Sequence, residues 1–233
     1  MMSQFLISDM LLPVWVSIKL ASITTLCLLL FATPLAYWLA KPSCGNVVGR
    51  IKILLMGIIA MPLVLPPTVI GFYLLLLLSP NVGIGQWLIE HNISPLVFTF
   101  EGLVIGSIIY SLPFYIQPVY AQFLRIPQSV MEVASLLEPS RLRRFIKIVL
   151  PQARIGIILG GLISFAHTIG EFGVVLMIGG SISGETKVVS IAIYEQVEAL
   201  NYEAAHLMSG ILIIMGIIMV ALIAAVSRLN QRP

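Results

Sequence analysis

The sequence has little charge. Only 10% of its 233 residues are charged, while 59% are hydrophobic, and an average soluble domain carries roughly 25% charged residues. The mean hydropathy is +1.05. This composition argues against a soluble globular domain. Because about 20 apolar residues form one helical span, we expect an all-α integral membrane protein.

Cysteine and metal-ligand patterns are also scarce. Cys27 lies in an apolar run and Cys44 in a polar loop, which argues against a disulfide framework. No histidine begins the His-Glu-x-x-His pattern of zinc proteases. Glu203-Ala-Ala-His206 is a single copy of a pattern that di-iron bundles use twice. An intramembrane metalloenzyme, the competing class, is therefore disfavoured, and we assign neither catalytic nor metal-binding residues.

The sequence lacks the Gly-x-x-x-x-Gly-Lys-Ser/Thr phosphate loop, so this chain is not expected to hydrolyse ATP or to bind a cofactor itself. It also lacks a large soluble segment that could capture a substrate from dilute solution. The first ten residues carry Asp9 and no basic side chain, and no cleaved secretory signal is expected.

Basic residues lie in the loops that flank the apolar runs. The pI near 9.0 is therefore explained by the positive-inside rule, without a nucleic-acid partner. The loop distribution places the amino terminus outside and the carboxyl terminus in the cytoplasm. We predict a single transmembrane domain over residues 1–233 with five spans. A sixth would form if a proline-broken segment re-enters the membrane. The five spans are expected at about 14–40, 51–79, 95–124, 155–180 and 204–226.

Two of these spans are irregular. Three prolines interrupt the second span near residues 61–68, and they free backbone carbonyls that lipid cannot satisfy. A proline kink stabilised by packing is one interpretation. The alternative places Pro66, Pro67 and Thr68 beside a translocation path.

The fourth span combines glycines with ionisable residues. Small residues let helices approach closely, whereas intramembrane ionisable residues are expensive and usually functional. His167 and Glu171 are four residues apart and are predicted to pair on one helix face. A purely structural pair is the alternative to a role in the pathway or its gate. The candidate gate residues here are Ser164, His167, Thr168, Gly170, Glu171, Phe172 and Gly173.

Residues 125–151 form the one long polar interruption of the chain. Apolar residues recur at i, i+3, i+4 and i+7 on both sides of Pro139, which predicts two short amphipathic helices joined at a bend. These helices are expected at a membrane surface. Contact with lipid headgroups and contact with a partner protein are the two interpretations.

This loop resembles that of ABC importer permeases, whose pattern is E-A-A, three residues, G, nine residues and I-x-L-P. Glu132 begins the first part, and Ile148, Leu150 and Pro151 match the last. Glu138 stands at the glycine position, where a positive φ would be strained for glutamate. The resemblance implies a surface that docks on an ATPase, with candidate residues Glu132, Val133, Ala134, Leu137, Glu138, Ser140, Arg141 and Arg143.

A second resemblance lies downstream. Gly170-Glu-Phe-Gly173, Met177-Ile-Gly-Gly180 and Gly184-Glu-Thr186 are similar to the matching stretch of molybdate permeases, and tungstate and sulfate permeases are close in pattern. The resemblance implies a type I ABC importer permease in the bacterial inner membrane. It further implies a second copy of the chain, a periplasmic oxyanion-binding protein, and ATP-Mg bound by a separate ATPase subunit.

Overall fold

The computed structural model describes residues 2–42, 45–138 and 140–229, and the regular structure in these ranges is helical. The expected all-α membrane fold is thus confirmed. Two short segments deviate from the α-helix, the 3-10 turn η1 and the π-turn η2. The elements are α1 (Met2–Ala40), α2 (Asn46–Ala60), η1 (Met61–Leu63), α3 (Pro67–Leu78), α4 (Gly83–Glu90), α5 (Phe100–Leu124), α6 (Gln128–Leu137), α7 (Arg141–Arg144), η2 (Phe145–Val149), α8 (Leu150–Gln152), α9 (Arg154–Ile169), α10 (Gly173–Gly179), α11 (Val189–Glu198) and α12 (Tyr202–Leu229).

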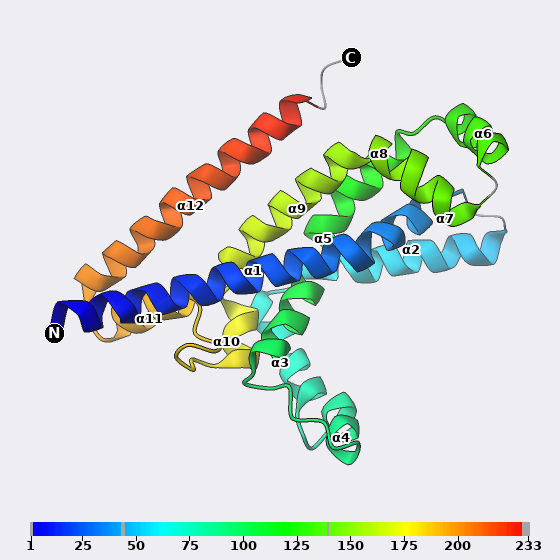
Figure 1. The fold of residues 1–233 in the computed structure, drawn as a ribbon. Helices are drawn as coiled ribbons and strands as arrows, with labels where there is room; N and C mark the ends of the chain where they lie inside the picture. Colours follow the sequence, from blue (N-terminus) through cyan, green and yellow to red (C-terminus); the bar gives the residue numbers. More distant parts are fainter. Residues whose placement is uncertain (1, 43–44, 139, 230–233) are drawn as a thin grey trace.

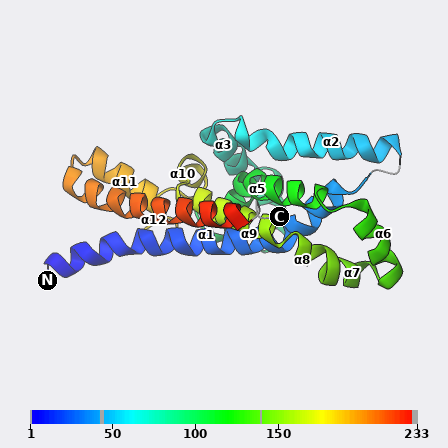
Figure 2. The same cartoon turned by 90° about the horizontal axis from the view of Figure 1, so that it is seen from above.

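Helices α1, α5 and α9 pack against one another and form the centre of the molecule. Small side chains such as Ala32 and Ala36 let α1 lie close to α5. The Thr33 and Tyr115 hydroxyls are hydrogen-bonded at 2.6 Å across the same contact. In both views, α6 and α7 lie at one end of α1 and α11 lies at the other (Figures 1 and 2). We call these the loop-helix end and the opposite end.

Two of the spans expected from the sequence are divided in the structure. The expected span 51–79 is two helices, because α2 ends at Ala60, just before Pro62, and α3 begins at Pro67. The expected span 155–180 is also divided, since α9 ends at Ile169. It reaches spanning length only when joined to residues 141–152 across a 74° bend.

Among the described residues, five helices are long and apolar enough to cross a membrane, or up to six if that bent pair is one span. The five are Met10–Ala40, Asn46–Leu63, Pro67–Glu90, Phe100–Leu124 and Tyr202–Arg228.

Glycines on α9 differ sharply in the space around them, which gives a stability prediction. A Cβ atom at Gly156 would lie 2.5 Å from Gln122 Cβ and 2.9 Å from the Pro118 carbonyl oxygen on α5. At Gly161 it would meet only Thr25 Cγ2, at 3.7 Å. Gly156→Ala should therefore cost about 1–3 kcal/mol through overpacking. Gly161→Ala should be neutral, or stabilising by up to about 1 kcal/mol through helix propensity.

Thermal unfolding of the two variants in the same detergent tests this difference. Equal midpoints for Gly156→Ala and the parent chain would show that α9 does not pack on α5 at this distance.

Candidate functional site

The proline break that the sequence indicated lies against a second helix break, at Gly170, that the sequence did not indicate. Helix α3 begins at Pro67 and α10 begins at Gly173, and these helices are in contact. A Cβ atom at Gly173 would lie 3.0 Å from Pro67 Cβ and 3.2 Å from the Thr68 nitrogen. The missing side chain of Gly173 therefore lets the two helix starts touch. We call this the break contact. It unites candidate gate residues that are more than one hundred positions apart in sequence.

A hydrogen-bonded cluster anchors the end of α9 to α5. The Thr168 hydroxyl donates to the Ser164 carbonyl oxygen at 2.9 Å. Thr168 Oγ1 and His167 Nδ1 each lie 2.9 Å from Ser111 Oγ. Each hydroxyl has one proton, so Ser111 donates to Thr168 and must accept from His167. This chain of donors places a proton on His167 Nδ1.

The His167 ring is enclosed by aromatic residues of α5. Its centroid lies 3.8 Å from that of Phe114, in a stacked arrangement, and 4.8 Å from that of Tyr110. Helix α5 thus supplies the imidazole's hydrogen-bond partner and its packing surface. Sequence reasoning missed Ser111, Tyr110 and Phe114, because nothing local indicates that this face of α5 meets α9.

The predicted pairing of His167 with Glu171 is wrong. Helix α9 ends at Ile169 with Gly170 as its cap, so the i, i+4 geometry of a continuous helix does not extend to Glu171. Both Glu171 carboxyl oxygens are buried without a hydrogen-bond partner among the described residues. The segment is instead held through its backbone, since the Ser190 hydroxyl of α11 donates to the Glu171 carbonyl oxygen at 2.6 Å.

The remaining gate candidates lie outside this hydrogen-bonded cluster. Phe172 packs against Tyr194 of α11, with ring centroids 5.4 Å apart. Pro66 and Thr68 are exposed on the surface of this single chain. No group of three or more His, Cys, Asp or Glu residues that could hold a metal ion occurs in the described part of the chain. The polar groups assembled here are mainly hydroxyls, one imidazole and one carboxyl.

The polar loop contains the two short helices that the sequence predicted, α6 and α7. Glu138 lies between them with φ −134° and ψ 97°, an extended conformation that any residue adopts. The strain expected for glutamate at the glycine position is therefore absent. Ser140 is the N-cap residue of α7, and Arg141 and Arg143 are exposed on that helix.

The apolar stripe of α6 is split between two surroundings. Ala134 is buried at 2% exposure, whereas Leu136 and Leu137 are 85% and 75% exposed. Val133 lies on the exposed side with them, and Glu132 is also exposed. Leu136 was not among the predicted contact residues, because the predicted apolar stripe runs along the helix face that carries Ala134. Exposed leucines at the tip of a polar loop are typical of a surface that binds a partner.

A membrane protein built from interrupted helices, with two short helices on one end, is the architecture of a transport permease. Residues 32–232 match the family model described as "Binding-protein-dependent transport system inner membrane component". The chain belongs to this family and is a multi-pass inner-membrane protein. It is a transport subunit and not itself an enzyme.

Two relatives of this chain are permeases for molybdenum and for sulfate. The chain is 45% identical over 194 residues to the molybdenum transport system permease protein ModB of Azotobacter vinelandii, covering 83% of this chain and 84% of the relative. It is 30% identical over 210 residues to the sulfate transport system permease protein CysW of Escherichia coli K12, covering 90% and 70%.

Solved structures share the fold at low identity. The inward-facing MetNI methionine ABC transporter matches with a TM-score of 0.70 at 14% identity, over 97% of this chain and 98% of that chain. The bacterial alginate ABC transporter in complex with a periplasmic protein matches with a TM-score of 0.65 at 16% identity, over 94% and 79%. The expected type I ABC importer permease fold is thereby confirmed.

The cluster around Ser111 generates a second stability prediction. Ser111→Ala removes two buried hydrogen bonds, and within a membrane each is worth about 0.6 kcal/mol, rising to about 1.7 kcal/mol. The expected loss is therefore about 1–3 kcal/mol. Ser107, one turn earlier on α5, is equally buried, but its hydroxyl has no hydrogen bond of normal geometry among the described residues and lies beside the Glu171 carboxyl instead of His167 or Thr168, so Ser107→Ala should cost less than Ser111→Ala.

Denaturant unfolding of the purified variants measures both changes. If Ser107→Ala and Ser111→Ala were equally destabilised, the hydrogen bonds to His167 and Thr168 would not be what anchors α9.

Proposed function

We propose that this chain is the permease subunit of an ABC importer that passes molybdate from a periplasmic binding protein into the cytoplasm. The observation that carries the proposal is the 45% identity to a molybdenum permease over most of both chains. Sulfate permeases match at about 30%, which favours molybdate over sulfate. Tungstate and sulfate remain the alternative substrates.

The energy for transport comes from a separate ATPase subunit in this proposal. The chain carries no phosphate loop, so ATP-Mg would bind to that partner and this chain would bind no cofactor. The exposed residues Val133, Leu136 and Leu137 of α6 supply an apolar contact for the ATPase. Arg141 and Arg143 flank that contact with positive charge. Contact with the ATPase explains exposed leucines on a charged loop better than lipid headgroups alone.

A second copy of the chain is needed to enclose the path. Transferring an isolated charge into a medium of low dielectric costs on the order of tens of kcal/mol by Born estimates, so an oxyanion must cross through a wetted channel. Pro66 and Thr68 are exposed on one subunit beside the break contact. In a homodimer these residues would face the other subunit across the channel, with lipid covering the remaining surface.

The break contact is the proposed gate. Ser164, Thr168 and His167 hold α9 in place, while Gly170, Phe172 and Gly173 form the turn into α10. Glu171 is not proposed as a ligand, because its negative charge would repel an oxyanion strongly at low dielectric. Uptake requires the α3 and α10 segments to separate and then to close again, so a side chain that fills their contact and prevents closure should block coupled transport.

Uptake by reconstituted vesicles tests the function and the gate together. Vesicles that contain the chain, its ATPase and its binding protein should accumulate molybdate only with ATP. Gly173→Leu should abolish this uptake because the added side chain overlaps Pro67. Gly216→Leu is the matched control, since a Cβ atom at Gly216 meets nothing within 4 Å.

Three outcomes would contradict parts of this account. Accumulation of sulfate in preference to molybdate would reassign the substrate. ATP-independent uptake would refute an ABC importer. Normal uptake by Gly173→Leu would remove the gate from the break contact.

The proposed orientation has the loop helices and carboxyl terminus in the cytoplasm and the amino terminus outside. Ser140 and Ser183 are both exposed, at the loop-helix end and in the segment between α10 and α11. On a background without Cys27 and Cys44, a membrane-impermeant thiol reagent should label Ser183→Cys in intact cells. It should label Ser140→Cys only after permeabilisation. The reverse pattern would invert the topology.

A further inference from the structure

Glu171 is the acidic side chain that is buried in the described part of the chain, at 4% exposure. It lies in the turn between α9 and α10. Both of its carboxyl oxygens are buried without a hydrogen-bond partner among the described residues. The backbone of this turn is held by Ser190, but that contact leaves the carboxyl group itself unused. A buried carboxyl without a partner requires a separate explanation.

The groups around this carboxyl offer too few hydrogen-bond donors for a negative charge. The Ser107 hydroxyl of α5 lies beside it and has no hydrogen bond of normal geometry itself. The backbone N–H groups of Gly170 and Glu171 already donate to carbonyl oxygens in the last turn of α9. Helix α10 begins without a side-chain cap, so its first N–H groups do not hold the carboxyl either. One hydroxyl can serve only one of the roughly four acceptor positions of a carboxylate.

No cation pairs with Glu171 among the described residues. The ion pair found there joins Lys187 to Glu195, and Lys19 Nζ lies over the Phe100 ring, 4.1 Å from its centroid. Phe172, the next residue in the chain, belongs to an apolar cluster of side chains from α1, α5, α10 and α11. An ionised carboxyl is so costly in such surroundings that the group takes up a proton instead.

We propose that Glu171 is a proton-binding site, whose carboxyl is neutral at physiological pH in this conformation and donates to the Ser107 hydroxyl oxygen. A neutral carboxyl carries one O–H donor, so the two unpartnered groups satisfy each other without a buried charge. The proton site does not depend on the proposed function or its substrate. It is compatible with both, because an ionised Glu171 would repel an oxyanion at the gate, whereas a neutral one does not.

The other titratable side chains around this turn differ from Glu171 in their chemistry. His167 of α9 lies against Tyr110 of α5, and Tyr194 of α11 packs against Phe172. Neither an imidazole nor a phenol contains a carbonyl group. The C=O stretch of a carboxylic acid therefore reports on a neutral acid and on none of these neighbours.

Infrared spectra of the purified chain in mild detergent at neutral pH test the proposal directly. Subtracting the spectrum of Glu171→Gln from that of the parent should leave a carboxylic acid C=O band, which shifts to lower frequency in deuterated water. Ser107→Ala should retain this band but move it to higher frequency, because the acid loses its acceptor.

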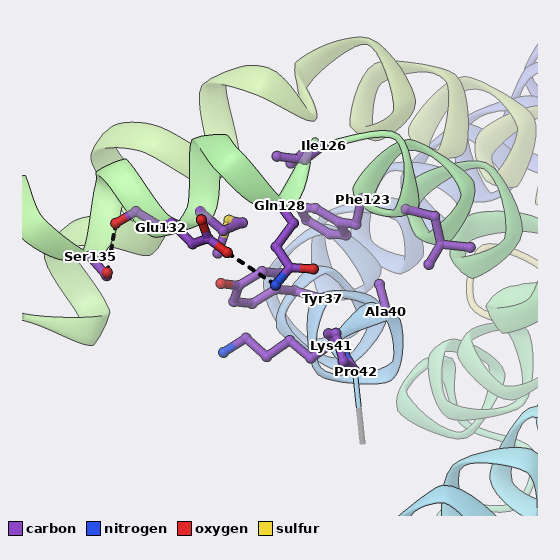
Figure 3. Close-up of a pocket in the computed structure, with 11 residues that line it drawn as sticks. Tyr37, Ala40, Lys41, Pro42, Phe123, Ile126, Gln128, Glu132 and Ser135 are labelled. Atoms are coloured by element: carbon purple, nitrogen blue, oxygen red, sulfur yellow. Dashed lines mark hydrogen bonds between the residues drawn. The ribbon is translucent and has the colours of Figure 1, made fainter. Parts of the chain in front are cut away.

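Glu132→Gln is the matched control for the loss of a carboxyl. Glu132 lines a cavity at the loop-helix end, where it is exposed and accepts a hydrogen bond from Gln128 at 3.1 Å (Figure 3). It thus has the water and the partner that Glu171 lacks. Subtracting the spectrum of Glu132→Gln from that of the parent should leave no acid band.

Stability against pH gives an independent readout. A glutamate in the unfolded chain is ionised above a pH of about 4.3, so a native state that keeps its proton loses stability as the pH rises. Between about pH 6 and about pH 9, the ratio of folded to unfolded parent should fall by up to about tenfold per pH unit relative to Glu171→Gln. Glutamine has the shape of the neutral acid, so this variant should fold. Denaturant unfolding across the pH range measures the ratio.

Any of four results would overturn the proposal. The first is the absence of an acid band in the parent, and the second is an equal band in the Glu132→Gln subtraction. The third is the same pH profile of stability for the parent and Glu171→Gln. The fourth is an acid band that disappears in sodium chloride but not in choline chloride, which would assign the site to a metal cation.

Discussion

Backbone groups freed by a broken helix must find partners, because hydrocarbon offers none. This constraint governs the whole chain, which breaks one helix at Pro66 and another at Gly170. The two breaks are tolerable because they lie against protein: Gly173 allows contact with Pro67, and Gly71 brings α3 close to Met177 on α10. The two breaks therefore face each other and not lipid alone.

The polar side chains follow from the same constraint. Ser111 on α5 binds the last turn of α9 through His167 and Thr168, so that the helix ends at a fixed position. Ser190 on α11 then holds the following turn through the Glu171 carbonyl oxygen. These attachments hold the chain on both sides of the turn at Gly170, which is where the gate is proposed. At the loop-helix end, Leu136 and Leu137 are instead exposed on this single chain, where the proposed contact with the ATPase would cover them.

The sequence predicted the fold class, the two loop helices and the break near Pro66, because composition, proline placement and apolar periodicity are local signals. It did not predict the break at Gly170, since the fourth span was expected to continue to residue 180. It could not predict that the breaks meet, since nothing local links Pro67 to Gly173. The His167–Glu171 pair failed because periodicity was extended through Gly170, where the helix stops. The strain predicted at Glu138 is absent, because its backbone is extended and does not adopt the positive φ that the family glycine suggested. Leu136 and Ser111 were not predicted, because the sequence does not show which face of each helix packs against a neighbouring helix.

A reversible cross-link tests the central claim that α3 and α10 must separate during transport. A Cβ atom at Gly71 would lie 2.8 Å from Met177 Cβ, so Gly71→Cys/Met177→Cys needs a separation of under about 1 Å to reach disulfide geometry. The smaller residue at 177 leaves room for the added side chain. On a background without Cys27 and Cys44, oxidised protein in vesicles should lose ATP-driven molybdate uptake, and a reductant should restore it. Full uptake with the disulfide formed would contradict the account.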